Sequence, residues 1–101
     1  MAAVRMPNPC FNLGRVVATP GAIAALVQVN SSATILLDRH CRGDWGELDA
    51  EDRLANNQAL ATGSRLFSAY VIQDTKFWVI TDAEDDDGQR MATTVLLPED
   101  Y

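Results

Sequence analysis

The 101-residue sequence contains little of what a metal site or a hydrolytic triad needs. It has one histidine, His40, and two cysteines, Cys10 and Cys41, which stand far apart in the chain. A structural zinc ion takes about four cysteine or histidine ligands, usually at short spacings. The sequence also lacks a phosphate-binding glycine loop, a His-Glu-x-x-His pair and a nucleophile elbow. We therefore expect neither a metal ion nor a cofactor.

Long apolar runs are also missing. A membrane-spanning helix needs roughly 18 or more consecutive apolar residues, whereas the apolar stretch of residues 16–29 is interrupted by Thr19-Pro20-Gly21. The first residues do not follow the basic and then apolar pattern of a secretory signal. The sequence therefore predicts a cytoplasmic protein without membrane association, in which the cysteines are reduced.

Positive charge is scarce, since 8 lysines and arginines stand against 14 acidic residues and give a net charge of −6. Proteins that bind nucleic acid neutralise phosphates with lysine and arginine, so this charge disfavours a nucleic-acid partner. It fits a protein that presents a negative surface to a basic protein, and it also fits a role in solubility alone. Residues 82–87 concentrate acidic side chains in one loop, but no glutamate stands where a calcium loop would be closed.

Hydrophobic patterning predicts a single α+β domain over residues 11–101, preceded by a flexible tail over residues 1–10. A short strand is expected over residues 11–18, followed by two to three helices. The first helix follows the capping signal Thr19-Pro20, and its residues Ile23, Leu26 and Val27 are expected to point inward. From residue 65 the pattern changes to a period of two, which predicts a three-stranded antiparallel β-meander packed against the helices.

The loop of residues 41–46 is the most unusual local feature, because it carries two glycines and directly follows His40. His40 is a candidate general base near neutral pH. Asp44 and Trp45 are candidate binding residues, with the indole ring as a stacking platform. The alternative is structural: Trp45 fills the core, Asp44 caps the loop, and His40 is a histidine with satisfied hydrogen bonds.

A second candidate set combines arginines with threonines of the last strand. A β-meander brings strand ends together, so Arg65 and Arg90 could approach Thr93 and Thr94. Arginines and hydroxyl groups that converge on a sheet can hold a phosphate or a carboxylate. The alternative is that the threonines are ordinary strand residues and that the arginines pair with nearby acids.

Several short motifs follow one another in a specific order. They are Leu13-Gly14-Arg15-Val16-Val17-Ala18-Thr19-Pro20-Gly21-Ala22, Arg39-His40, Gly43-Asp44-Trp45-Gly46, Asn56 or Asn57, Arg65-Leu66-Phe67-Ser68-Ala69-Tyr70, Trp78-Val79-Ile80-Thr81 and the final Thr93-Thr94-Val95-Leu96-Leu97-Pro98-Glu99-Asp100-Tyr101. This order resembles a family of small proteins of proteobacterial plasmids and integrated mobile elements, often labelled plasmid-related proteins. The resemblance covers residues 11–101 and implies a mobile-element setting without a settled activity. It adds Asn57 and Tyr70 to the candidate binding residues.

Two functions of different classes follow from these features. The first is an accessory protein of mobile genetic elements that binds another protein through an acidic surface; a stand-alone regulator fits the same features, and a dimer is left open. The second is a small metal-independent ribonuclease or phosphotransferase similar in architecture to barnase and RelE. Its catalytic residues would be His40, Arg65 and Thr94, which must then share one cleft.

Overall fold

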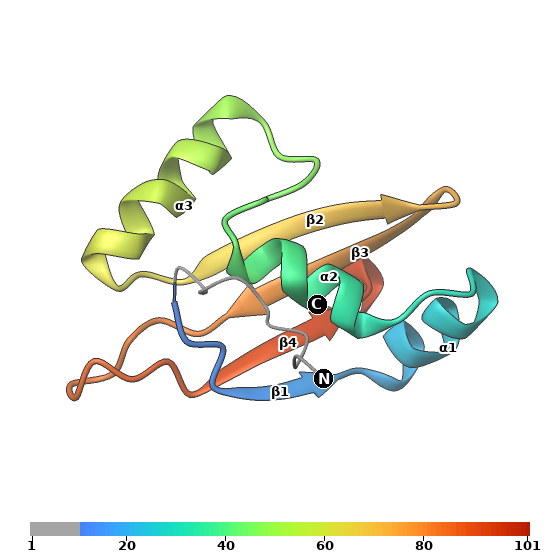
Figure 1. Ribbon diagram of the computed structural model, residues 1–101, viewed down its shortest axis with the longest axis horizontal. Coiled ribbons are helices and arrows are strands. Elements are labelled where there is room, and N and C mark those ends of the chain that lie inside the picture. The colour runs from blue at the N-terminus through green and yellow to red at the C-terminus, as the bar shows by residue number, and fades with distance from the viewer. Residues whose placement is uncertain (1–10) are drawn as a thin grey trace, which may run out of the picture.

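The computed structural model describes residues 11–101 (Figure 1), so the predicted tail over residues 1–10 lies outside the described residues. Three helices and a four-stranded sheet confirm the predicted α+β class. In chain order the elements are β1 (Arg15–Ala18), α1 (Pro20–Gln28), α2 (Ala33–Cys41), α3 (Ala50–Thr62), β2 (Leu66–Ile72), β3 (Thr75–Thr81), β4 (Ala92–Leu96) and a short 3₁₀ helix, η1 (Pro98–Asp100).

The strands are arranged in the order β1-β4-β3-β2. Strands β2, β3 and β4 form the predicted antiparallel meander. Strand β1, for which the sequence indicated no partner, pairs in parallel with β4, with Arg15 opposite Ala92 and Ala18 opposite Val95. A parallel pair needs a long crossover connection, and here it comprises all three helices and the first two strands of the meander. The sheet is therefore mixed.

Strand β1 begins at Arg15 rather than at residue 11 as predicted. Gly14, directly before it, has a φ of +66°, which favours glycine. A Cβ atom at this position would lie 2.2 Å from the carbonyl oxygen of Arg90. The chain therefore approaches the start of β4 too closely for a side chain, and only then enters the sheet.

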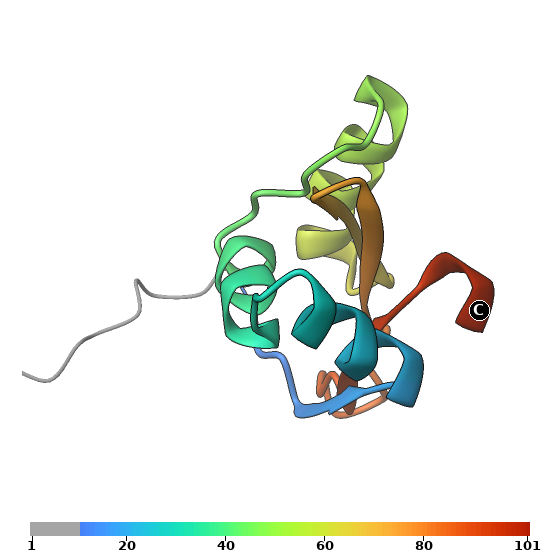
Figure 2. The same cartoon turned by 90° about the vertical axis from the view of Figure 1, so that its right-hand side faces the viewer.

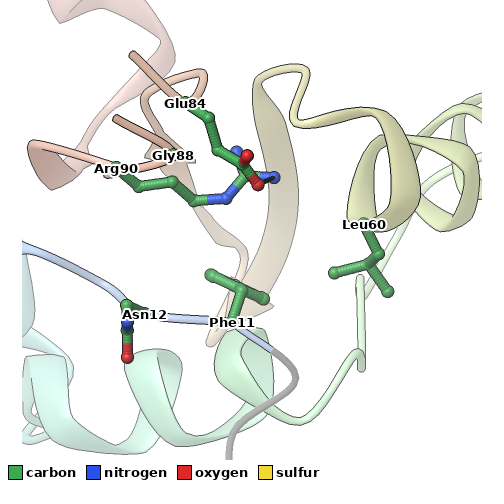
Figure 3. Close-up of a pocket in the computed structure, with 6 residues that line it drawn as sticks. All are labelled: Phe11, Asn12, Leu60, Glu84, Gly88 and Arg90. Atoms are coloured by element: carbon green, nitrogen blue, oxygen red, sulfur yellow. Dashed lines mark ion pairs between the residues drawn. The ribbon is translucent and has the colours of Figure 1, made fainter. Parts of the chain in front are cut away.

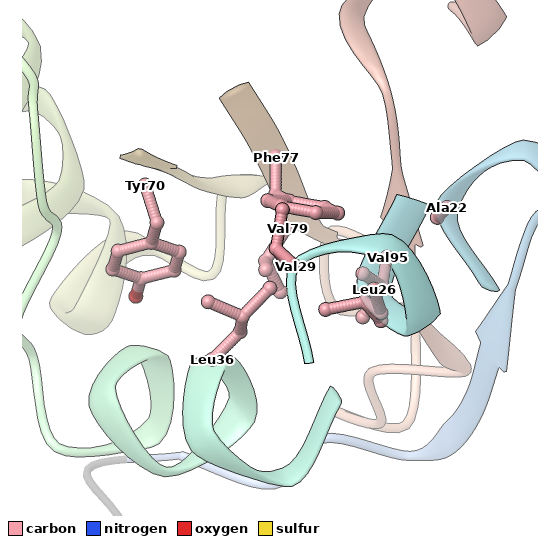
Figure 4. Packing of buried hydrophobic residues seen from close by; sticks show 8 residues of the cluster. All are labelled: Ala22, Leu26, Val29, Leu36, Tyr70, Phe77, Val79 and Val95. Carbon is pink, nitrogen blue, oxygen red and sulfur yellow. The ribbon is translucent and has the colours of Figure 1, made fainter. Parts of the chain in front are cut away.

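Helices α1 and α2 cover one face of the sheet, while η1 lies on the opposite side (Figures 1 and 2). The main hydrophobic core fills the space between these helices and the sheet (Figure 4). It consists of Ala22, Leu26, Val29, Leu36, Tyr70, Phe77, Val79 and Val95. Full burial of a leucine or phenylalanine side chain contributes about 1.5–3 kcal/mol, so this layer fixes which face of the sheet is covered.

Local capping signals set the ends of two helices. The Thr19 hydroxyl accepts a hydrogen bond of 3.1 Å from the Ala22 N–H, with Pro20 at the first helical position. The Asp49 carboxylate accepts one of 2.8 Å from the Asp52 N–H, and Gly63 ends α3 in the left-handed conformation. Thr19 and Pro20 thus begin α1 as the sequence predicts.

The inward face of α1 differs from the prediction. Leu26 is buried, but Ile23 and Val27 are 53% and 74% exposed. Residues Ala22, Leu26 and Val29, spaced by four and three positions, form the buried stripe instead. The prediction grouped the larger side chains, whereas the small Ala22 is the fully buried residue of this helix.

Strand β2 is an edge strand whose outer backbone groups are partly covered. The Asn56 side chain of α3 donates a hydrogen bond of 2.6 Å to the Phe67 carbonyl and accepts one of 3.0 Å from the Phe67 N–H. Two residues further on, the Ala69 N–H donates to the Trp45 carbonyl and the Ala69 carbonyl accepts from the Glu47 N–H. Covering an edge in this way prevents it from pairing with other chains.

No single helix among residues 11–101 is long and apolar enough to cross a membrane. Helices α1 and α2 reach the required length and apolar composition only when they are taken together, and their axes are bent by 106° at the break between them.

We predict that Asn56→Ala lowers the free energy of unfolding by about 2 kcal/mol, because it leaves the N–H and C=O of Phe67 without their partner. Urea denaturation followed by circular dichroism measures the change. Gln58→Ala, two positions along the same helix and exposed, is the matched control and should stay within about 0.5 kcal/mol of the parent. Equal stability of the two variants would contradict the proposed role of Asn56.

Candidate functional site

The only histidine lies in the interior and joins a chain of buried hydroxyl groups. His40 Nδ1 lies 2.5 Å from the Ser68 hydroxyl and Nε2 lies 2.9 Å from the Thr81 hydroxyl. The Thr81 and Thr93 hydroxyls are 2.7 Å apart, and Thr93 donates a hydrogen bond of 2.6 Å to the Leu13 carbonyl. One continuous chain thus links α2, the three strands of the meander and the segment before β1.

This chain determines where the protons lie. Because Thr93 donates to the Leu13 carbonyl, its oxygen accepts from the Thr81 hydroxyl. Thr81 in turn accepts from the N–H of His40 Nε2, which leaves Nδ1 to accept from the Ser68 hydroxyl. His40 is therefore the neutral Nε2–H tautomer. Burial, and then the positive charge of Arg90, lower the pKa of His40 from 6.5 to about 3.

Aromatic rings enclose the remaining sides of His40. Its ring meets those of Phe11 and Trp45 edge to face, with centroids 5.2 and 5.7 Å apart. Trp45 is only 5% exposed, and its Nε1–H donates a hydrogen bond of 3.0 Å to the side-chain oxygen of Asn57. Trp45 is thus a core residue and presents no free ring for stacking.

Asp44 and Tyr70 are occupied in shaping the loop before α3. The Asp44 carboxylate accepts hydrogen bonds from the Arg39 Nε–H at 2.7 Å and from the Gly46 N–H at 3.2 Å. Arg39 and the Gly46 N–H both lower the pKa of this carboxyl group, with Arg39 as the main cause. The Tyr70 hydroxyl donates to the Asp44 carbonyl at 2.7 Å, and burial raises the pKa of that hydroxyl.

Arg90 forms one wall of a polar cavity of about 200 Å³ (Figure 3), lined by Phe11, Asn12, Leu60, Glu84, Gly88 and Arg90. Its guanidinium donates to the carbonyls of Ser64, Asp82 and Ala59 at 2.7, 3.0 and 3.1 Å. Glu84 lies 3.8 Å away as an ion-pair partner. Arg90 is 6% exposed and ties the end of α3 to the loop after β3, so its side chain is occupied by the fold.

The three residues predicted for catalysis are not brought together. His40 and Thr93 lie on the face covered by α1 and α2. Thr94 follows Thr93 and stands opposite Ile80 on the other face, because adjacent strand residues point to opposite sides. Arg65 donates a hydrogen bond of 2.9 Å to the Tyr101 hydroxyl, and the two belong to a pocket on that other face. The sheet therefore separates Arg65 and Thr94 from His40.

The open face of the sheet carries an apolar groove that the sequence interpretation missed. Its volume is about 240 Å³, and it is lined by Arg65, Phe67, Trp78, Ile80 and Tyr101. Trp78 meets Phe67 and Tyr101 nearly edge to face, with centroids 5.1 and 5.7 Å apart. Alternation groups Trp78 with Ile80, but Phe67 joins them on one face only through the register that sets Phe67 opposite Ile80. Nothing local indicated that the helices would leave this face open.

Among residues 11–101 no group of three or more histidine, cysteine or acidic side chains is placed to hold a metal ion. No protein-family model, curated protein or solved structure matches the chain.

The environment of His40 makes stability depend on pH. Since the pKa of His40 is about 3 in the folded state, against an ordinary value of 6.5, the unfolded chain binds more protons below pH 6.5. The free energy of unfolding should then fall as the pH is lowered from 6.5 toward 3, with a slope that approaches about 1.4 kcal/mol per pH unit. Urea denaturation between pH 7 and 5, above the range in which most carboxylates titrate, measures this dependence of the free energy of unfolding on pH.

The control is His40→Gln, which keeps hydrogen-bonding groups but does not titrate, so this part of the slope should disappear. Because the chain has one histidine, its imidazole proton signals can be followed by NMR without assignment of others. An imidazole that titrates near pH 6.5 in the folded protein would contradict the buried neutral state.

Proposed function

We propose that the protein is a non-catalytic accessory protein of mobile genetic elements that binds another protein. The partner would place one large apolar or aromatic side chain in the groove on the open face of the sheet. Basic residues beside that side chain would lie against the acidic loop of residues 82–87. The observation that carries this proposal is the groove, because it is an exposed apolar hollow in a protein of net charge −6.

The position of the acidic loop supports this arrangement. In the β2–β3 ladder Leu66 stands opposite Thr81. Arg65, directly before β2, and Asp82, directly after β3, therefore lie at the same end of the sheet. Figure 1 shows the loop between β3 and β4 leaving the sheet at the end where β2 begins. The groove and the most acidic segment of the chain therefore lie toward the same end of the sheet, which fits a partner that carries basic residues on that side.

The size of the groove fits a single side chain. A cavity of about 150 Å³ is large enough for benzene, so the groove of about 240 Å³ can take an aromatic ring or a branched aliphatic side chain. Nucleic-acid bases need flat, exposed rings on which to stack. Phe67 and Trp78 lie at 86° to each other, so the two rings cannot both lie flat on the sheet. The groove thus favours a protein segment.

The interior histidine supports binding over phosphoryl transfer. A general base must reach the substrate within hydrogen-bonding distance, whereas both ring nitrogens of His40 are bonded to buried hydroxyl groups. Its pKa of about 3 also makes it a weak base at neutral pH. The ribonuclease alternative would need His40 and Arg65 on one face, and they lie on opposite faces.

Selection from a phage-displayed random peptide library on the whole protein tests the proposal. We expect enriched peptides to share one aromatic or long aliphatic residue with lysine or arginine beside it. Trp78→Ala and Tyr101→Ala should each weaken such peptides by about tenfold or more, measured by isothermal titration calorimetry. Tyr101 is largely exposed, so its removal leaves the core intact. Val71→Ala, on the same face outside the groove, is the matched control and should change little.

The charge of the partner is tested separately. Asp86→Asn combined with Asp87→Asn removes two charges from the acidic loop and should weaken basic peptides by roughly threefold at low salt. Glu51→Gln combined with Asp52→Asn removes the same charge from the start of α3 and should not. Enrichment of acidic peptides, or binding that survives both groove variants, would overturn the proposal.

A further inference from the structure

The outer edge of β1 is a second exposed feature, separate from the groove. The Arg15 N–H donates to the Met91 carbonyl and the Thr19 N–H to the Val95 carbonyl, so the odd-numbered residues of β1 face β4. The N–H and C=O groups of Val16 and Ala18 therefore point away from the sheet. Within residues 11–101 no strand pairs with this edge, since β1 ends the strand order.

We propose that β1 pairs antiparallel with β1 of a second copy of this chain, about a two-fold axis at Val17. In that register Val16 stands opposite Ala18 of the partner subunit, and the two residues exchange both of their backbone hydrogen bonds. The symmetric pair does the same on the other side of the axis. The two Val17 side chains then meet at the axis as a close, non-hydrogen-bonded pair.

The same register brings opposite charges together. Arg15 would stand opposite Thr19 of the partner subunit. Within each copy the Thr19 hydroxyl donates a hydrogen bond of 2.6 Å to the Asp100 carboxylate. Arg15 and Val17 alternate onto the open face of the sheet, and η1, which contains Asp100, lies on that side (Figure 2). Arg15 forms no ion pair within residues 11–101. Each Arg15 would therefore meet an Asp100, twice per dimer.

The sequence around β1 avoids the electrostatic repulsion that the net charge would otherwise cause between two copies. Two copies of charge −6 repel each other wherever acidic surfaces meet. Residues 16–37 contain no charged residue at all. Val16 and Val17 are 44% and 38% exposed on this edge. A two-fold contact here buries uncharged, partly apolar surface and keeps the acidic loop of residues 82–87 apart from its copy.

The dimer leaves the proposed binding groove open. The groove lies on β2 and β3, at the opposite side of the strand order from β1. A two-fold axis perpendicular to the sheet keeps the open faces of both copies on the same side. The assembly would present two grooves in one direction, which would strengthen attachment to a partner that carries two binding segments.

A charge exchange between two variants tests the pairing. Arg15→Glu alone places like charges opposite Asp100, and Asp100→Lys alone places like charges opposite Arg15, so each should dimerise at least tenfold more weakly than the parent chain. Mixed in equal amounts, the two variants should recover the parent affinity, because the heterodimer has one native and one exchanged contact. Sedimentation velocity measures the dimer against the 11.0 kDa monomer.

Val16→Pro is an independent test of the strand edge. It removes an N–H that points away from the sheet, so the fold should persist, as circular dichroism can verify, while dimerisation should be lost. A monomeric parent chain at high micromolar concentration would overturn the inference. A dimer that neither Val16→Pro nor the charge variants weaken would show that the copies meet elsewhere.

Discussion

The hydrogen-bonded chain from Ser68 through His40, Thr81 and Thr93 to the Leu13 carbonyl is the constraint on which the other features depend. A buried polar group left without a partner costs about 1–3 kcal/mol, and here each hydroxyl and each imidazole nitrogen has one. The chain connects α2 to all three strands of the meander and fixes the segment that enters β1. Losing any member would leave its neighbours unpaired, so these elements hold their positions together.

This constraint also decides which face of the sheet can act. The polar chain, the aromatic rings around His40 and the core beneath α1 and α2 occupy most of the covered face with structural contacts. Residue types that often act in catalysis, such as histidine and threonine, serve there in packing and hydrogen bonding. The open face keeps accessible apolar and aromatic side chains, and the proposed function therefore rests on that face.

The two edges of the sheet differ in how their backbone groups are covered, and this difference agrees with the two proposals. The outer edge of β2 is covered by Asn56 and by residues 45–47, which limits pairing on the side near the groove. The outer edge of β1 has no such cover within the described residues. A protein that protects one edge and leaves the other available can join a copy of itself through one edge only, while the groove stays accessible to a partner.

The sequence by itself determined the features that depend on near neighbours. The capping signal Thr19-Pro20 marked the start of the first helix, since capping involves residues only three or four positions apart. The two-residue period determined the antiparallel meander, in which the pairing of β4 then places Thr93 and Thr94 on opposite faces. The α+β class followed from the order of these elements.

Only the tertiary structure decided which residues meet across the chain. The partners of His40 lie 28 and 41 positions away, so no local pattern distinguished a buried neutral histidine from an accessible base. The parallel pairing of β1 with β4, and the face of the sheet that the helices leave open, likewise depend on how all elements pack together. Burial and long-range pairing minimise the free energy of the whole chain, and for that reason the groove and the free edge became visible only in the fold.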